Sequence, residues 1–159
     1  MERKVYTIGY EGQSLESFLA LLKREKVRLV ADVREMPLSR KPGFSKTAIA
    51  KALEANGIAY VHIRDLGCPS AIRDRFRADS DWNRYVVAFT VYLAKQRDAV
   101  VALAEICKAD RTALMCFERD FNRCHRTFVA REVARTLKGD VAHIVEAAAL
   151  RTGATVRAA

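Results

Sequence analysis

Short apolar runs alternate with amphipathic segments along nearly the whole chain, and this alternation constrains the fold more than any other feature. The runs are mostly β-branched or aliphatic: Val5–Tyr10, Arg28–Val33, Ile58–Ile63, Thr112–Cys116 and Val141–Val145. Runs that are apolar on both sides are typical of strands buried on both faces of a sheet. The sequence therefore predicts an α/β fold: a single three-layer Rossmann-like domain, with a mostly parallel sheet of about five strands and helices on both faces.

Helical spacing of apolar residues marks most of the segments between these runs. The predicted helices lie after Ser14, between Ser45 and Gly57, from Asp81 onward, and over 125–139. Ser14 and Ser45 are the expected N-caps. The series at Val100 either continues the third helix or begins another after Asp98. The stretch 64–81 is polar and rich in arginine, and it is predicted to be a long connection.

The length of 159 residues predicts one domain, 1–159, with a core at about 5–145 and a weakly patterned tail at about 146–159. No apolar run approaches the length of a membrane span, and the N-terminus lacks the features of a signal peptide. We therefore expect a cytoplasmic protein without membrane contact. The four cysteines are expected to be reduced thiols.

The net charge of +9 comes from 28 basic and 19 acidic residues, and most of the basic residues are arginine. The planar guanidinium group suits bidentate contact with phosphate or carboxylate. The charge therefore favours an anionic partner, although a basic surface that only aids solubility explains it equally well.

Polar side chains gather where the predicted strands end. In a parallel α/β sheet the carboxyl ends of the strands meet at one edge, which is where such folds bind ligands. The residues that the pattern brings there are Tyr10, Asp32, Arg34, Arg40, Cys116, Glu118, Cys124, His125 and Arg126. The sequence thus predicts a functional site at this edge.

The segment "CFERDFNRCHR", Cys116–Arg126, is the richest part of that edge. A helix that begins at "CHR" directs its free N–H groups toward the edge and favours an anion there. Arg34, Arg40 and Arg126 are the predicted anion-binding residues, with Tyr10 and Asp32 beside them. Cys116 or Cys124 is the candidate nucleophile, and Glu118 or His125 is the candidate general acid or base.

Each of these residues also has an ordinary structural interpretation. Asp32 could pair only with Arg34, and His62 could be a satisfied, half-buried histidine. Cys116 could be a small core residue, and Trp82 is expected in the core. The arginines between Arg73 and Arg77 could be solvated.

Four segments resemble the family called domain of unknown function 488: "TIGYEGQSLESF", "LVADVREMPLSRKPGFSK", "GIAYVHIRDLG" and "ALMCFERDFNRCHR". The last is similar to the family's Cys-x-Glu-x5-Cys-His-Arg pattern, and the second to its Asp-Val-Arg…Pro-x-Ser-Arg pattern. The resemblance covers about Val5 to Leu137. It implies a Rossmann-like α/β fold and no particular reaction.

These observations predict a protein that binds a phosphate-bearing ligand, a nucleotide or nucleic-acid-derived molecule, and acts on it by thiol chemistry. One alternative is a nucleic-acid-binding module without chemistry, using Arg73–Arg77 and Trp82. Another is a metal site built from Cys116, Glu118, Cys124 and His125. The spacing matches no standard zinc signature, and the neighbours Cys124 and His125 are not expected to face one ion. The sequence leaves both the cofactor and the oligomeric state unknown.

Overall fold

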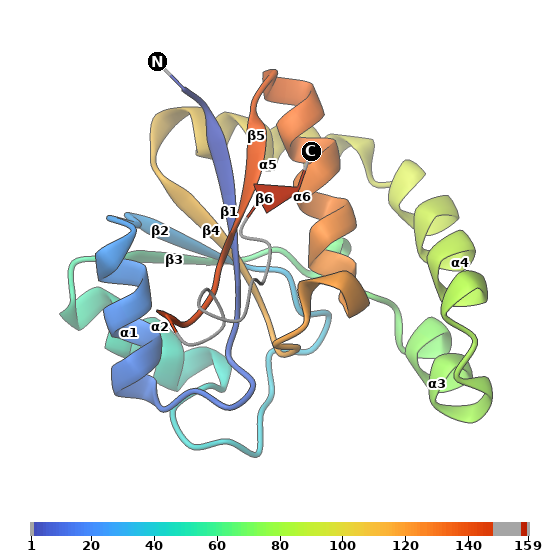
Figure 1. Cartoon of the computed structure of the whole chain (residues 1–159), viewed down its shortest axis with the longest axis horizontal. Coiled ribbons are helices and arrows are strands. Elements are labelled where there is room, and N and C mark those ends of the chain that lie inside the picture. The colour runs from blue at the N-terminus through green and yellow to red at the C-terminus, as the bar shows by residue number, and fades with distance from the viewer. Residues whose placement is uncertain (1, 148–156, 159) are drawn as a thin grey trace.

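The computed structural model describes residues 2–147 and the backbone of 157–158, and it contains a sheet between two layers of helices (Figure 1). The strands are β1 (Lys4–Gly9), β2 (Leu29–Asp32), β3 (Ala59–His62), β4 (Thr112–Cys116), β5 (Asp140–Ile144) and β6 (Arg157–Ala158). Their order is β3-β2-β4-β1-β5-β6, with the first five parallel and β6 antiparallel to β5. The predicted parallel α/β fold is confirmed, and each of the five predicted strands ends within one residue of the observed one.

Among the described residues, six α-helices connect the strands from β1 to β5, and helices lie on both faces of the sheet. They are α1 (Leu15–Arg24), α2 (Lys46–Ala55), α3 (Ser70–Asp79), α4 (Trp82–Ala94), α5 (Arg97–Ala109) and α6 (His125–Leu137). Helices α1 and α2 cover one face, and α5 and α6 cover the other (Figure 1). Helix α4 packs beside α6, where the rings of Phe89 and Phe128 lie 6.4 Å apart.

The central strands are apolar in both directions because each contributes side chains to two cores. Val30 and Ala113 are buried under α1 and α2, whereas the next residues, Ala31 and Leu114, are buried under α5 and α6. Consecutive strand residues point to opposite faces, so a strand covered on both faces needs an unbroken apolar run. This is the pattern from which the fold was predicted.

The stretch 64–81 is not the long irregular connection that the sequence predicted. It contains a short 3₁₀ turn, Arg64–Leu66, and the helix α3. None of the side chains of α3 is fully buried, so the helix lacks a clear apolar stripe. Its surface carries ion pairs between residues one turn apart, such as Arg75–Asp79 and Arg77–Asp74. The apolar pattern of this helix is too weak to be detected in the sequence.

The predicted helix boundaries are mostly confirmed. Helix α4 ends at Ala94 and α5 begins at Arg97, so the series at Val100 belongs to a separate helix. Ser14 caps α1 by accepting a hydrogen bond from the Ser17 backbone N–H at 3.0 Å. Ser45 occupies the N-cap position of α2, but its hydroxyl group bonds to the backbone of Ser39 instead of to an N–H group of its own helix.

The path of the chain creates a switch point between β4 and β1. From β1 the chain crosses to β2 through α1 on one face, and from β4 it crosses to β5 through α6 on the other face. The two connections leave neighbouring strands in opposite directions, which opens a crevice at their carboxyl ends. Most of the predicted tail, 146–159, lies outside the described residues. No helix within the described ranges has both the length and the apolar character needed to cross a bilayer.

Candidate functional site

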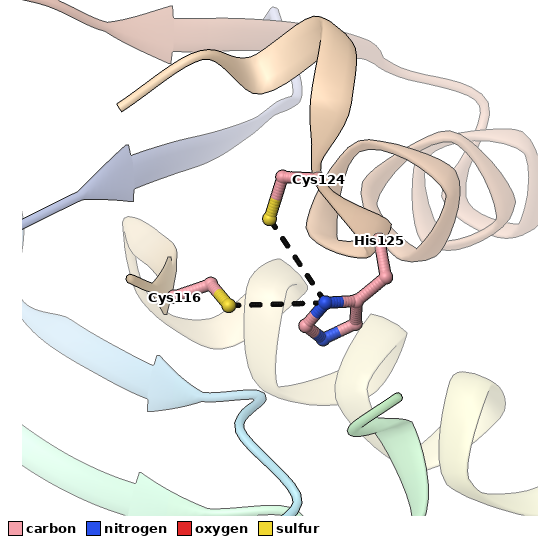
Figure 2. A group of neighbouring side chains, drawn as sticks. All are labelled: Cys116, Cys124 and His125. Carbon is pink, nitrogen blue, oxygen red and sulfur yellow. Dashed lines mark hydrogen bonds between the residues drawn. The ribbon is translucent and has the colours of Figure 1, made fainter. Parts of the chain in front are cut away.

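Two thiols, an imidazole and a carboxylate meet at the switch point. Cys116 is the last residue of β4, and Cys124 and His125 begin α6. Nδ1 of His125 lies 3.7 Å from the Cys116 sulfur and 3.9 Å from the Cys124 sulfur, and Figure 2 shows both side chains directed at this nitrogen. The three donor atoms lie within 4.8 Å of one another, and Oε2 of Glu118 lies 3.2 Å from each sulfur. The four candidate catalytic residues therefore come together.

The neighbours Cys124 and His125 converge because they do not share one backbone conformation. Cys124 is the N-cap of α6 and is extended, with φ −137° and ψ 140°, whereas His125 is the first helical residue. The expectation that two adjacent side chains would not face one point is therefore wrong here. It holds inside a helix or a strand, but not where an extended residue meets a helix.

Gly9 allows the turn after β4 to approach β1. Gly9 is paired with Cys116 in the sheet, and a β-carbon at Gly9 would lie 1.9 Å from the Glu118 carbonyl oxygen. Any larger residue would push this turn away from the sheet. The glycine thereby places Glu118 above the two sulfurs.

The tautomer of His125 is set by a hydrogen bond to the main chain. Its Nε2 lies 2.7 Å from the carbonyl oxygen of Val33. A carbonyl oxygen only accepts, so Nε2 carries a proton, and Nδ1 is the ring nitrogen that faces the sulfurs. The ring is buried and stacks edge-on against Phe89, which fixes its orientation.

The proton affinities of the cluster are strongly coupled. Burial opposes ionisation of Cys124, but the hydrogen bond from Cys116 and the positive charge of Arg126 hold its pKa well below the usual value. Cys116 has a raised pKa because of its hydrogen bond to Cys124 and its burial. Burial raises the pKa of Glu118 to about 7. The pKa of His125 is raised despite burial, because Cys124 lies beside it. Negative charge in the cluster therefore collects on Cys124.

A cleft of about 710 Å³ opens above the cluster. Cys116, Glu118 and His125 form part of its wall, whereas Cys124 is only 1% exposed and lies behind them. The loop after β2 supplies the opposite wall, including Arg34 and Arg40. Part of the cluster therefore faces a cleft that is open to solvent.

Arg34 and Asp32 form a buried ion pair within a hydrogen-bonded network. Nε and Nη2 of Arg34 donate to the two Asp32 oxygens at 2.8 and 2.6 Å. Nη1 donates to the Tyr10 hydroxyl at 3.1 Å and to the Phe44 carbonyl at 2.7 Å. Because Phe44 lies at the far end of the loop that Arg34 begins, this guanidinium group fastens the loop. The structural interpretation of Asp32, an ion pair with Arg34, is therefore confirmed.

Arg126 is buried against the Cys116–Glu118 turn and is 1% exposed. Its Nη1 donates to the Glu118 carbonyl oxygen at 2.6 Å, and its Nε has no hydrogen-bond partner among the described residues. The described part of the chain places no carboxylate in an ion pair with it. Arg126 is therefore a buried positive charge directed at the cluster, whereas Arg40 is exposed on the loop.

The other singled-out residues are mainly structural. His62 is half-buried and lies 2.7 Å from the Arg34 carbonyl oxygen through its Nε2. Trp82 packs against the core beside Tyr85, with the guanidinium group of Arg123 over its ring. All four cysteines are free thiols, and burial raises the pKa of Cys107 to about 12.

Some residues of the site escaped the sequence interpretation. Tyr60 donates to Asp32 Oδ2 at 2.6 Å, and Met36, Leu38, Lys41 and Phe117 line the cleft. The only signal for Met36, Leu38 and Lys41 was their position in the loop that also contains Arg40, since isolated loop residues have no periodic pattern.

The fold and site define a class: a doubly wound α/β protein with a buried Cys/Cys/His cluster at the switch point of its sheet. The family model described as "Domain of unknown function DUF488" matches residues 14–133, and the chain belongs to that family. No curated protein and no solved structure matches the chain.

Proposed function

We propose that the chain binds a divalent transition-metal ion, with zinc as the first choice, through Cys116, Cys124 and His125. The ion would act on a ligand held in the cleft. The observation that carries this proposal is the convergence of two sulfurs and one imidazole nitrogen within 4.8 Å. Two cysteines and one histidine are a known set of protein donors at catalytic zinc, which leaves a fourth position open.

The distances within the cluster suit tetrahedral coordination. With Zn–S at about 2.3 Å and Zn–N or Zn–O at about 2.0 Å, neighbouring donors lie about 3.5–3.8 Å apart. The sulfur–nitrogen distances are 3.7 and 3.9 Å, and both sulfur–oxygen distances to Glu118 are 3.2 Å. Small side-chain shifts would place the two sulfurs and the nitrogen around one ion, with the Glu118 oxygen beside the fourth position.

The surroundings of the donors also suit a metal site. The bond from His125 Nε2 to the Val33 carbonyl oxygen is the outer contact that a metal-binding histidine commonly makes. Two thiolates neutralise a divalent ion, and an ionised Glu118 carboxylate beside it would add one negative charge. The positive charge of Arg126, which forms no ion pair within the described residues, would then balance the whole cluster.

A thiol nucleophile is the second candidate, and the position of Cys116 in the cleft wall favours it. The position of Cys124 weighs against this role, because its sulfur lies behind the cleft wall and is almost fully buried. A reacting molecule would meet Cys116, Glu118 and His125 first. Cys116 and His125 would also hold the proposed metal, with Glu118 beside its fourth position, where the ion would polarise a bound water or ligand oxygen.

Metal content tests the proposal directly. The untagged chain, produced with zinc in the medium, should contain about one zinc per molecule by elemental analysis. Cys124→Ser and His125→Ala should lose most of it, while Cys68→Ser and Cys107→Ser should retain it. The second pair is the matched control, since it removes thiols outside the cluster. Circular dichroism would verify that all four variants are folded.

Cobalt binding gives an independent measurement. Co²⁺ added to the metal-free protein should produce a thiolate-to-cobalt absorption band, which Cys116→Ser should weaken. A folded wild-type protein that takes up neither zinc nor cobalt would sink the proposal. If that protein instead loses activity on alkylation of Cys116 alone, the thiol nucleophile is the better explanation.

A further inference from the structure

The cleft above the cluster is lined by unusually exposed apolar side chains. Six large apolar side chains are exposed among the described residues: Met36, Leu38, Val87, Val91, Val101 and Phe117. Three of the six, Met36, Leu38 and Phe117, line this one cleft. Their exposed fractions are 54%, 68% and 44%. Apolar surface concentrated around an opening, and not scattered singly, marks a place where a ligand is bound.

Two cations on the same wall are free to bind an anion. Arg40 and Lys41 line the cleft, and neither forms an ion pair within the described part of the chain. Arg73 and Arg77, which line it as well, already lie 3.0 Å from Glu35 and 2.7 Å from Asp74. The anion-binding capacity of the cleft is therefore concentrated at its loop wall.

That loop is held in one shape. The Ser39 backbone N–H donates to the Ser45 hydroxyl at 3.0 Å, and the Lys41 backbone N–H donates to the Ser39 hydroxyl at 3.1 Å. The Arg34 guanidinium group joins the start of the loop to Phe44 at its end. A wall that is ordered before binding loses little conformational entropy when a ligand arrives.

We propose that the cleft binds one nucleotide unit, with the base against Phe117 and the phosphate against Arg40 and Lys41. Phe117 is supported from behind by Tyr10, whose ring meets it edge-on at 5.4 Å, and Tyr10 in turn stacks on Phe44 at 4.6 Å. A flat ring and a negative charge are the two features that this wall recognises together. The apolar surface is limited to three side chains, which suits a base better than a long acyl chain.

The inference rests on the proposed metal site only for the place at which the nucleotide would react. Phe117 lies between Cys116 and Glu118 in the chain, so a base against it lies next to the cluster. Binding itself requires the loop and Phe117, and neither supplies a metal donor. Failure of nucleotide binding and failure of zinc binding are therefore separate results.

Calorimetric titration of the zinc-loaded chain with AMP tests the inference. Ribose 5-phosphate lacks the base and adenosine lacks the phosphate, and each should bind at least about tenfold more weakly than AMP. A short single strand with a 5′-phosphate identifies the source of the nucleotide. Binding like that of AMP would assign the end of a strand as a ligand, and weaker binding would assign the free nucleotide.

Paired variants assign the contacts. Phe117→Ala and the double change Arg40→Ala with Lys41→Ala should each weaken AMP binding about tenfold, with unchanged zinc content. Val91→Ala removes an equally exposed apolar side chain on α4, and Arg75→Ala with Lys108→Ala removes two exposed cations away from the cleft. Both controls should bind AMP like the wild type.

Three results would overturn the inference. One is the absence of AMP binding to a folded, zinc-loaded chain. Another is equal binding of ribose 5-phosphate and AMP, which would leave a simple anion site. The third is binding of strands that grows with their length and ignores the terminal phosphate, which would indicate a nucleic-acid-binding module. In each case the zinc content would still report separately on the proposed function.

Discussion

Two buried polar groups lie at the carboxyl ends of the neighbouring strands β2 and β4, and they differ in how completely their hydrogen bonds are made. At the end of β2, the Asp32 carboxylate accepts from Arg34 and from the Tyr60 hydroxyl at distances of 2.6 to 2.8 Å. The remaining bonds of the Arg34 side chain go to Tyr10 and Phe44. This network, which we call the β2 network, consists of close, charge-assisted bonds.

At the end of β4, the sulfurs of Cys116 and Cys124 make contacts of 3.2 to 3.9 Å, which are ordinary lengths for sulfur, but thiols are weak donors and acceptors. Two buried side-chain nitrogens lack a hydrogen-bond partner among the described residues, and both lie on this side of the molecule: Nε of Arg126 and Nε2 of His143. The positive charge of Arg126 also acts on His143. The β2 network contains no such atom.

The difference separates a structural network from a binding one. Buried polar groups in folded proteins are nearly always paired, so unpaired groups need an explanation of their own. The β2 network is complete and holds the cleft loop in place. In our proposal, a bound ion completes the cluster at β4, so that the same sheet edge carries one group that stabilises the fold and one that is arranged for a ligand.

The largest expected effect comes from breaking the β2 network. Arg34→Met would leave the Asp32 carboxylate buried without its cation, which costs about 3–5 kcal/mol of unfolding free energy. Urea unfolding of chelator-treated protein measures this loss. Arg75→Met is the matched control, since its guanidinium group is 66% exposed and the change should cost less than about 0.5 kcal/mol. Equal effects of the two changes would show that the β2 network does not stabilise the fold.

The sequence was sufficient to predict the five parallel strands, because the central ones are apolar toward two cores and this leaves continuous runs. It was insufficient for α3, whose stability depends on ion pairs and on packing of Ile72 and Phe76 beside α4. Neither contribution leaves an apolar stripe in the sequence. Strand order was likewise unpredictable, since several crossovers satisfy the same alternation.

For the site, the sequence could predict which residues lie near one another, but not which of their atoms contact each other. The rule that strand ends share one edge was enough to assemble Cys116, Glu118, Cys124 and His125. Their side chains converge because the backbone at Cys124 is extended, and no residue type in the sequence predicts that conformation. In the same way, the sequence left open whether Asp32 pairs with Arg34, and only the placed side chains show that it does.

An intermediate effect on the free energy of unfolding is expected from His143, whose Nε2 lacks a hydrogen-bond partner among the described residues. Burial, with the charges of Arg126 and Arg131, lowers its pKa from 6.5 to about 4. Between these pH values the unfolded chain binds a proton that the native chain does not, so His143 makes stability fall as the pH falls from about 6.5 to 4. The full change is about 3 kcal/mol.

His143→Asn should remove this dependence. Asparagine keeps a polar atom close to the Thr7 hydroxyl, which lies 2.6 Å from His143 Nδ1. The measured quantity is the difference in unfolding free energy between wild type and variant at several pH values without metal. This difference cancels the opposite contribution of Glu118, whose raised pKa favours the native state as the pH falls below about 7. A difference that stays constant from pH 4 to 6.5 would contradict the assignment.

The smallest effect is expected from removing one hydrogen bond of the β2 network, the bond between the Tyr60 hydroxyl and Asp32. Its removal tests whether this bond stabilises the fold. The Tyr60 hydroxyl donates to Asp32 Oδ2 at 2.6 Å, and burial and Asp32 raise the pKa of Tyr60, so the donated proton is held at any physiological pH. Tyr60→Phe should cost about 1.5 kcal/mol, the lower end for a bond to a charged group, because Arg34 still neutralises the carboxylate. Tyr6→Phe is the matched control, since the Tyr6 hydroxyl bonds to nothing in the described part of the chain and its ring keeps the cation–π contact with Arg111. Urea unfolding of the two variants should therefore differ by about 1 kcal/mol or more, and equal midpoints would mean that the β2 network is complete without Tyr60.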